Sequence, residues 1–306
     1  MTISNAQNSK WENNTTRNVI RLRENLTMNS PIISADWLSE RLLDPTIKII
    51  EVSSKKGSEA GYADRHIPGA INFWWKDLCW DENDRQFVTP EQLARRLGEK
   101  GISDDDRLII YGDPVQYGTY AFWALKMAGH PNLMLLDGGR TKWLEDELPT
   151  TKGLPEAKNV EYKIQSPEQW MRLGRDDIRD NLGKTDRVLL DVRTPEEYSG
   201  ERVMEYGQFD HGAERGGRIP GAKHLFFKEL LNPDDTFKSS TELEAIFEKI
   251  ITEQEKSNEI VTYCRLSHRA TLVWTAMTYI MAYKDVKIYD GSWTEWGSIV
   301  GFPVEK

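Results

Sequence analysis

Short apolar runs alternate with longer amphipathic stretches along most of the chain. The runs are rich in Val, Ile and Leu, which is typical of buried β-strands, and they lie at residues 47–52, 107–111, 133–136, 188–192, 259–263 and 286–289. Apolar residues three and four apart predict helices between them, at residues 91–98, 119–128, 242–250 and 270–283. This alternation predicts an α/β fold with a mainly parallel sheet that helices cover on both faces.

The sequence partly repeats itself, which indicates that the chain is built from two similar halves. Three pairs of strings match: residues 66–70 with 218–222, 109–111 with 261–263, and 137–143 with 290–296. Three unrelated strings at an offset of 152 or 153 residues are hard to produce by chance. The offset is only 140 between residues 50–52 and 190–192, so the second half carries an insertion of 12 residues within 199–217. We expect His211, Arg215 and Arg218 to form a cationic rim there.

The repeat and the length of 306 residues together predict two domains. The first is expected at residues 31–148 and the second at 161–306, joined by a linker at 149–160 that contains Pro, Gly, Lys and Glu. Residues 1–30 contain seven Asn and no continuous apolar block. We therefore expect a polar, mobile tail there rather than a secretory signal.

Composition and charge exclude several classes of function. No apolar run approaches the roughly 18 residues that a membrane helix needs, and a net charge of -9 argues against general nucleic-acid binding. Cys79 and Cys264 are the two cysteines, too few for a disulfide framework or a cysteine-rich zinc site. No glycine-rich phosphate loop or histidine cluster indicates a cofactor or a metal. We expect a cytoplasmic protein without cofactor, membrane or nucleic-acid partner.

Cys264 lies where a strand is expected to meet a helix. It follows the apolar run at 259–263 and precedes the helical pattern that starts near Ala270. Backbone amides at a helix N terminus have no partners inside the helix, and they stabilise negative charge placed there. Arg265 and Arg269 act in the same direction. We therefore predict that Cys264 is a nucleophile at neutral pH.

The matching loop of the first half lacks these groups. Gly112 occupies the position of Cys264, and Asp113 occupies that of Arg265. Ser53 likewise stands where the second half has Arg193. A free cysteine is more often an ordinary buried residue than a reactive one. The difference between the halves favours the reactive interpretation and confines the chemistry to the second half.

Taken together, these strings resemble the rhodanese sulfurtransferases. The resemblance rests on the Ile-Pro-Gly-Ala string in each half, on Asp191-Val-Arg193, on the single cysteine of the second half, and on the string at 290–296. It covers roughly residues 31 to 306. It implies two tandem rhodanese-like domains, of which the first is inactive and the second forms a persulfide on Cys264. It also implies that Arg193 contacts the sulfonate of the substrate and that Arg269 is the loop arginine.

The length of the loop separates sulfur transfer from phosphate chemistry. In related phosphatases five residues separate the cysteine from its arginine, whereas residues 265–268 supply four here. The shorter ring of backbone amides, from Leu266, Ser267 and His268, suits one terminal sulfur better than a phosphoryl group. The cationic loop is closer to the thiosulfate-using bacterial type than to the small neutral loop of mercaptopyruvate-using enzymes. It lacks a glycine that several of those loops contain.

We therefore predict a thiosulfate sulfurtransferase. Cys264 would attack the outer sulfur of thiosulfate, sulfite would leave, and the persulfide would pass its sulfur to cyanide or a thiol. Arg193, Arg269 and Arg265 would bind the small anionic donor. We expect His268 to contribute its backbone amide and to pack locally, without acid–base work. The alternatives are a 3-mercaptopyruvate sulfurtransferase, a persulfide carrier that serves a protein partner, and a cysteine phosphatase.

Overall fold

The computed structural model describes residues 30–57, 61–83, 85–207 and 212–306. Nearly all of the tail expected at 1–30 and His211 of the insertion lie outside the described residues. Residues 32–306 form two five-stranded sheets in which every pair of neighbouring strands is parallel. No helix of this described part combines the length and apolar character needed to cross a bilayer.

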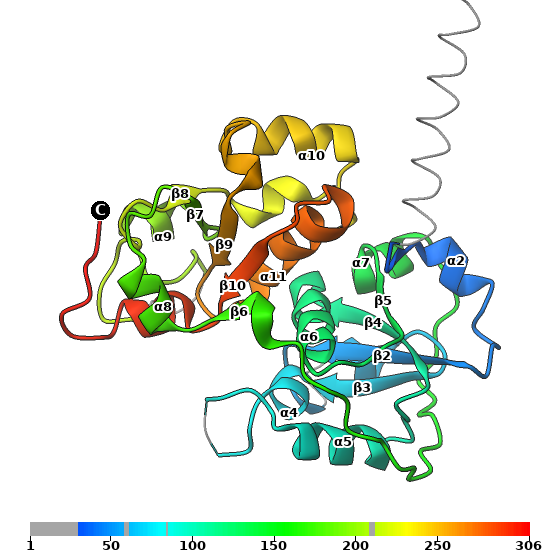
Figure 1. The fold of residues 1–306 in the computed structure, drawn as a ribbon. Helices are drawn as coiled ribbons and strands as arrows, with labels where there is room; N and C mark the ends of the chain where they lie inside the picture. Colours follow the sequence, from blue (N-terminus) through cyan, green and yellow to red (C-terminus); the bar gives the residue numbers. More distant parts are fainter. Residues whose placement is uncertain (1–29, 58–60, 84, 208–211) are drawn as a thin grey trace, which may run out of the picture. The chain divides into compact units, whose positions relative to one another are not determined.

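The first sheet has the strand order β1-β5-β4-β2-β3 (Figure 1). Its strands are β1 (Ile32–Ile33), β2 (Ile47–Ser53), β3 (Ala70–Trp74), β4 (Arg107–Asp113) and β5 (Leu133–Leu136). The helices of this half are α2 (Ala35–Ser39), α3 (Gly61–Asp64), α4 (Trp75–Cys79), α5 (Pro90–Glu99), α6 (Val115–Met127) and α7 (Gly139–Glu145).

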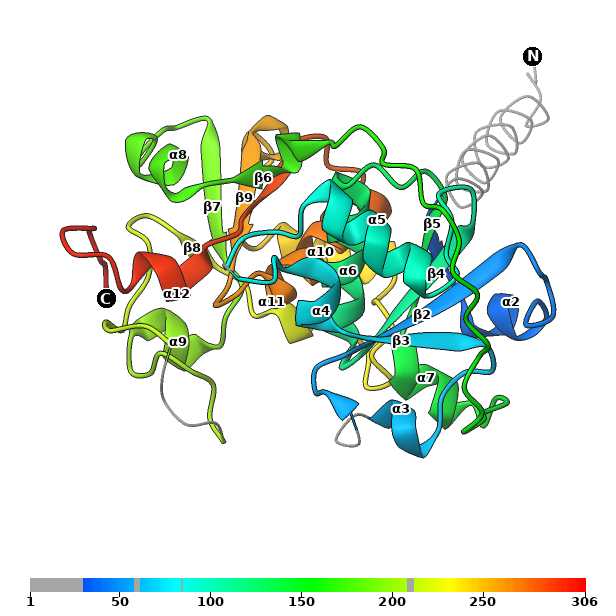
Figure 2. The ribbon, with the colours of Figure 1, turned by 90° about the horizontal axis from the view of Figure 1, so that it is seen from below.

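The second sheet repeats this topology as β6-β10-β9-β7-β8 (Figures 1 and 2). Its strands are β6 (Arg172–Leu173), β7 (Arg187–Asp191), β8 (Lys223–His224), β9 (Glu259–Tyr263) and β10 (Val286–Tyr289). The helices are α8 (Arg175–Asp180), α9 (Pro195–Ser199), α10 (Ser240–Phe247), α11 (His268–Thr275) and α12 (Ser292–Trp296), with a π-helical turn at Ala276–Ile280 and 3-10 turns at Gln169–Met171, Phe227–Leu230 and Glu255–Ser257.

The repeated topology confirms the predicted fold of two parallel sheets, and all six predicted strands exist with ends within two residues of expectation. The four other strands escaped prediction. Three of them contain two residues each, too few to show any periodicity, and β3 follows the Ile-Pro-Gly-Ala string directly. The helix predicted at 270–283 ends earlier, because the chain changes from α11 to the π-helical turn at Ala276.

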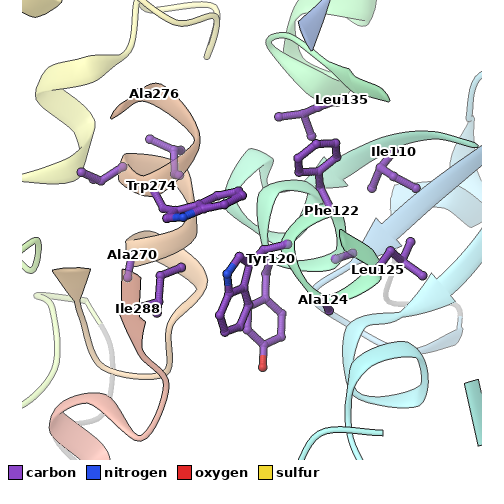
Figure 3. Packing of buried hydrophobic residues seen from close by; sticks show 14 of the residues in the cluster. Ile110, Tyr120, Phe122, Ala124, Leu125, Leu135, Ala270, Trp274, Ala276 and Ile288 are labelled. Atoms are coloured by element: carbon purple, nitrogen blue, oxygen red, sulfur yellow. The ribbon is translucent and has the colours of Figure 1, made fainter. Parts of the chain in front are cut away.

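One hydrophobic cluster joins the two halves at helices α6 and α11. Phe122 of α6 meets Tyr279 of the second half edge to face, with ring centroids 5.7 Å apart. The side chain of Trp274 extends from α11 toward α6 (Figure 3). Beside this apolar contact, the hydroxyls of Thr119 and Thr271 are hydrogen bonded at 2.9 Å. Since α6 follows the Gly112 loop and α11 follows the Cys264 loop, this packing brings the two loops together.

Candidate functional site

Cys264 is the first residue after β9, and its residue exposure is 1%. The turn after β10 holds its backbone at both polar atoms. Its N–H donates to Ser292 Oγ at 3.2 Å, and its carbonyl accepts from the N–H of Trp293 at 2.9 Å. The carbonyl of Arg265 accepts from Thr294 N–H at 3.2 Å. The turn after β10 therefore fixes the start of the loop. It does not take a hydrogen bond from the backbone N–H groups that follow Cys264.

Those amides form a candidate anion site. In the part of the chain that the structure describes, no acceptor takes a hydrogen bond from the backbone N–H groups of residues 265–270. Ser267 has a left-handed conformation with φ 70°, so the loop curls before α11 begins at His268. Free N–H groups in a curled segment at a helix N terminus bind anions. The predicted amides of Leu266, Ser267 and His268 all belong to this set, which we call the amide cradle.

The matching loop of the first half is closed. A Cβ on Gly112 would clash with the backbone N of Gly118 and lie 2.6 Å from the carbonyl oxygen of Pro114. The start of α6 therefore packs directly onto the position where Cys264 has its side chain. Asp113 lies 3.5 Å from the guanidinium of Arg140, which further closes this edge of the first sheet.

Arg269 is held by a carboxylate that the sequence analysis missed. Its two terminal nitrogens donate to the carboxylate oxygens of Glu197 at 2.6 and 2.9 Å. Burial raises the pKa of Glu197, but the hydrogen bonds and the charge of Arg269 outweigh it, so this pKa lies below its usual value. Glu197 also closes the capping box of α9 with Thr194. The Thr-x-x-Glu pattern directly after Arg193 indicates such a capping box, and it could have pointed to Glu197 from the sequence.

Arg193 is completely buried beneath the site rather than exposed at its surface. Its Nε and Nη2 donate to the two carboxylate oxygens of Asp191 at 2.9 and 2.6 Å, and Nη2 also reaches the carbonyl of Gly217. The guanidinium lies over the ring of Trp293 at 4.6 Å. Its Nη1 has no partner among the described residues. The sulfonate contact predicted for Arg193 can use that nitrogen alone unless the pair with Asp191 opens.

The first half contains an analogous buried pair built from a different position. Glu51, which matches Asp191, lies 3.6 Å from the guanidinium of Arg140. Arg140 matches Trp293 in the repeat, whereas Ser53 matches Arg193. Each half therefore keeps a carboxylate and an arginine at this edge, but the arginine comes from a different element.

Arg265 is the loop arginine without a carboxylate. Its side chain has no hydrogen bond or ion pair with any described residue. Burial lowers the pKa of Arg265, and the charge of Arg269 acts in the same direction, while Cys264 and Glu197 oppose them. Of the three predicted arginines, Arg265 alone has its full hydrogen-bonding capacity available in the described structure.

The first half supplies an aromatic wall beside the cradle. The ring of His268 packs against three aromatic side chains, with centroid distances of 4.3 Å to Trp75, 4.6 Å to Tyr117 and 4.5 Å to Tyr120. Burial, helped by the two loop arginines, lowers the pKa of His268 well below its usual value. His268 is thus a neutral packed ring. This wall was not predicted from the sequence, although Tyr117 follows the closed loop that matches the Cys264 loop.

The other cysteine offers no competing nucleophile. Cys79 is completely buried on α4 and belongs to the shared hydrophobic cluster. Burial raises the pKa of the Cys79 thiol well above its usual value. A thiol that is held protonated is a poor nucleophile, because the thiolate is the reactive form.

The expected cationic rim of the insertion is wrong for Arg215 and Arg218. Arg215 donates to four backbone carbonyls of the C-terminal segment, those of Trp296, Gly297, Ile299 and Phe302. Arg218 forms an ion pair with Glu305. Both side chains fasten the end of the chain, because carbonyl and carboxylate oxygens there satisfy their donors. His211 lies outside the described residues.

The fold defines an architectural class: two α/β domains with parallel sheets, the second of which has a cysteine in the loop between a strand and a helix. The model of the rhodanese-like domain matches residues 34–146 and again 174–299. The chain therefore belongs to the rhodanese family, and we describe it as a rhodanese-family sulfurtransferase.

Similar proteins support this assignment along most of the chain. "Sulfur carrier protein TtuD" of Thermus thermophilus is 38% identical over 281 residues, which span 90% of this chain and 96% of that protein. A "Putative thiosulfate sulfurtransferase" of Haloferax volcanii has the same identity and coverage. Among solved structures, "Crystal structure of YnjE" has a TM-score of 0.75 at 25% identity, over 90% of this chain and 68% of that one. These likenesses bear out the tandem fold.

Glu197→Gln is expected to lower the free energy of unfolding by about 3 kcal/mol at pH 7, because it leaves the buried charge of Arg269 unpaired. The lowered pKa of Glu197 gives the pair a contribution that is present above about pH 4.3 and is lost as the pH falls through that lowered pKa. The difference from wild type should therefore shrink in acid. Urea unfolding from pH 3 to pH 7 measures it. Glu196→Gln on the same helix is the control, and an equal loss there would contradict the assignment.

Gly112→Ala is expected to lower the free energy of unfolding by about 2 to 3 kcal/mol, because the new Cβ meets backbone that cannot rotate away. Gly174→Ala is the matched control, since its φ is -95° and no described atom lies within 4 Å of a Cβ there. Chemical denaturation compares the two. A stable Gly112→Ala variant would show that the first loop has room for a side chain.

Proposed function

We propose that this protein transfers sulfane sulfur from thiosulfate to a thiol or cyanide through a persulfide on Cys264. The observation that carries the proposal is the amide cradle: the backbone N–H groups of residues 265–270, which have no acceptor in the described part of the chain, directly follow Cys264 and lead into α11. The names of two relatives, "Sulfur carrier protein TtuD" and "Putative thiosulfate sulfurtransferase", point to the same chemistry. A reducing compartment such as the cytoplasm suits it, since both cysteines are free thiols.

The transfer takes two displacement steps. The Cys264 thiolate attacks the outer sulfur of thiosulfate, a sulfur–sulfur bond forms, and the bond to the sulfonate breaks with its electron pair leaving on sulfite. The product is a persulfide anion whose outer sulfur the amide cradle would stabilise. Cyanide or a thiolate then attacks that outer sulfur, and the Cys264 thiolate leaves. The charge balances in both steps, and no redox partner is required.

The three arginines divide between binding and support in this proposal. Arg265 meets the sulfonate, because it is the arginine of the loop without a carboxylate partner among the described residues. Arg269 forms an ion pair with Glu197, and Arg193 forms one with Asp191. They hold the loop and the neighbouring strand end in place, and Nη1 of Arg193 remains for a weaker contact with the donor.

Incubation with thiosulfate should add one sulfur atom to the wild-type protein, removable with cyanide. Intact-protein mass spectrometry measures this gain. Cys264→Ser should gain none, because the nucleophile is absent. Cys79→Ser should gain one sulfur like the wild type, since that buried thiol takes no part. Sulfur on the Cys264→Ser variant would overturn the proposal.

Arg265→Gln is expected to raise KM for thiosulfate about tenfold or more, because it removes a charge-assisted hydrogen bond to a dianion. The rate constant of the second step, measured in a single turnover of preloaded protein with cyanide, should change little. Arg41→Gln removes the same charge far along the chain and is the control. An unchanged KM in Arg265→Gln would assign the sulfonate contact to Arg193 instead.

The same assay on the wild-type protein with 3-mercaptopyruvate in place of thiosulfate compares the two sulfur donors.

A second candidate function is a persulfide carrier that hands its sulfur to a protein. The observation that favours it is the name of the Thermus thermophilus relative, a sulfur carrier protein. Slow turnover with thiosulfate and cyanide, together with fast single-turnover transfer to a protein thiol, would support the carrier. Fast turnover with cyanide would support the enzyme.

A further inference from the structure

Ser267 adopts a backbone conformation that ordinarily favours glycine. Its φ is 70°, and it is completely buried at the point where the Cys264 loop enters α11. A left-handed conformation is strained for a residue with a Cβ, and such strain persists where the surroundings hold it. The side chain of Ser267 must therefore make contacts that keep it in this position.

The hydroxyl of Ser267 binds the turn after β10. It donates to the carbonyl of Asp290 at 2.7 Å and lies 3.1 Å from Asp290 Oδ1, an arrangement in which one proton is shared between two oxygens. The other carboxylate oxygen of Asp290 accepts from Arg172 Nη2 at 3.1 Å. The guanidinium of Arg172 lies over the ring of Phe87 at 4.6 Å. We call Ser267, Asp290 and Arg172 the loop clasp.

The first half contains the acid of the clasp without its hydroxyl. Asp137 matches Asp290, whereas Val115 matches Ser267. Asp137 instead accepts a hydrogen bond from the backbone N–H of Phe237 in the second half, at 2.9 Å. The same aspartate therefore fastens the two halves together in one copy and fastens the reactive loop in the other.

We propose that Asp290 is a positioning residue, which acts through Ser267 to hold the amide cradle at the curvature that stabilises a persulfide on Cys264. Fixing the side chain of Ser267 fixes the peptide planes on both sides of it, and the N–H groups of Ser267 and His268 belong to the cradle. Donors held in place before the charge develops stabilise it without reorganisation. This proposal rests on the proposed persulfide chemistry and names the residues that prepare the loop for it.

Two substitutions of Ser267 separate positioning from stability. Ser267→Ala removes the hydroxyl and keeps the strain, so both the denaturation midpoint and the rate of persulfide formation should fall. Ser267→Gly removes the hydroxyl and relieves the strain, so its midpoint should stay near that of wild type. Its single-turnover rate of persulfide formation should nevertheless fall about tenfold or more, because the cradle loses its fixed geometry.

Substitutions of the two matching aspartates give a paired control. Asp290→Asn should slow persulfide formation to a similar extent as Ser267→Gly. Asp137→Asn should leave that rate unchanged, because its side chain accepts a hydrogen bond from Phe237 N–H and not from Ser267. Each protein is loaded with thiosulfate and, separately, with inorganic polysulfide, which gives up a sulfur atom to a thiolate and is shortened by one. Mass spectrometry follows the gain of sulfur.

The outcomes separate this proposal from the proposed function. If folded Ser267→Gly gains sulfur at the wild-type rate, or if Asp137→Asn slows as much as Asp290→Asn, the clasp has no positioning role. If wild type takes sulfur from polysulfide but not from thiosulfate, the proposed donor is wrong while the polysulfide rates still decide on the clasp. A wild-type protein that takes sulfur from neither overturns both proposals.

Discussion

The free amide groups of residues 265–270 are the constraint on which the rest of the site depends. Backbone N–H groups without acceptors favour collapse of a loop onto the nearest carbonyl or water, because an unpaired buried donor is costly. In the first half an amide of the matching loop has such an acceptor, since Tyr117 N–H donates to the carbonyl of Pro114 at 3.0 Å, and the start of α6 occupies the space where Gly112 has no side chain. In the second half the loop stays open, because the turn after β10 takes the remaining polar groups of Cys264 and Ser267.

The first half has no nucleophile, since Gly112 stands at the matching position, but its side chains support the site. It contributes the aromatic wall of Trp75, Tyr117 and Tyr120 against His268. It also shares one hydrophobic cluster with the second half through α6 and α11. Loss of the first half would therefore expose His268 and remove the support behind the cradle, which gives a physical reason why the chain carries both copies.

Much of this arrangement follows from the sequence. The apolar runs predicted six of the seven strands that are longer than two residues, and the comparison of the two copies singled out Cys264 because Gly112 stands in its place. Both inferences need only local patterns and one internal alignment. The strands of two residues could not be predicted, because pairing with a neighbour defines them rather than any pattern of their own.

The charged partners could not be predicted in the same way. Glu197 and Arg269 are 72 residues apart, and sheet topology alone brings them within hydrogen-bonding distance. Arg193 can be buried because Asp191 and the carbonyl of Gly217 accept its hydrogen bonds. The sequence does not show that these two acceptors lie beside its guanidinium. The cationic rim was inferred from charge alone, and Arg215 turned out to bind carbonyl oxygens. A charged residue in a sequence can form an ion pair or a hydrogen bond, but the sequence alone does not show which partner the fold brings next to it.

A structure of the protein after loading with thiosulfate shows where the transferred sulfur is held. One extra sulfur should lie on Cys264 and accept hydrogen bonds from the backbone amides of Leu266, Ser267 and His268. A persulfide that points away from these amides, or an extra sulfur at Cys79, would contradict this expectation.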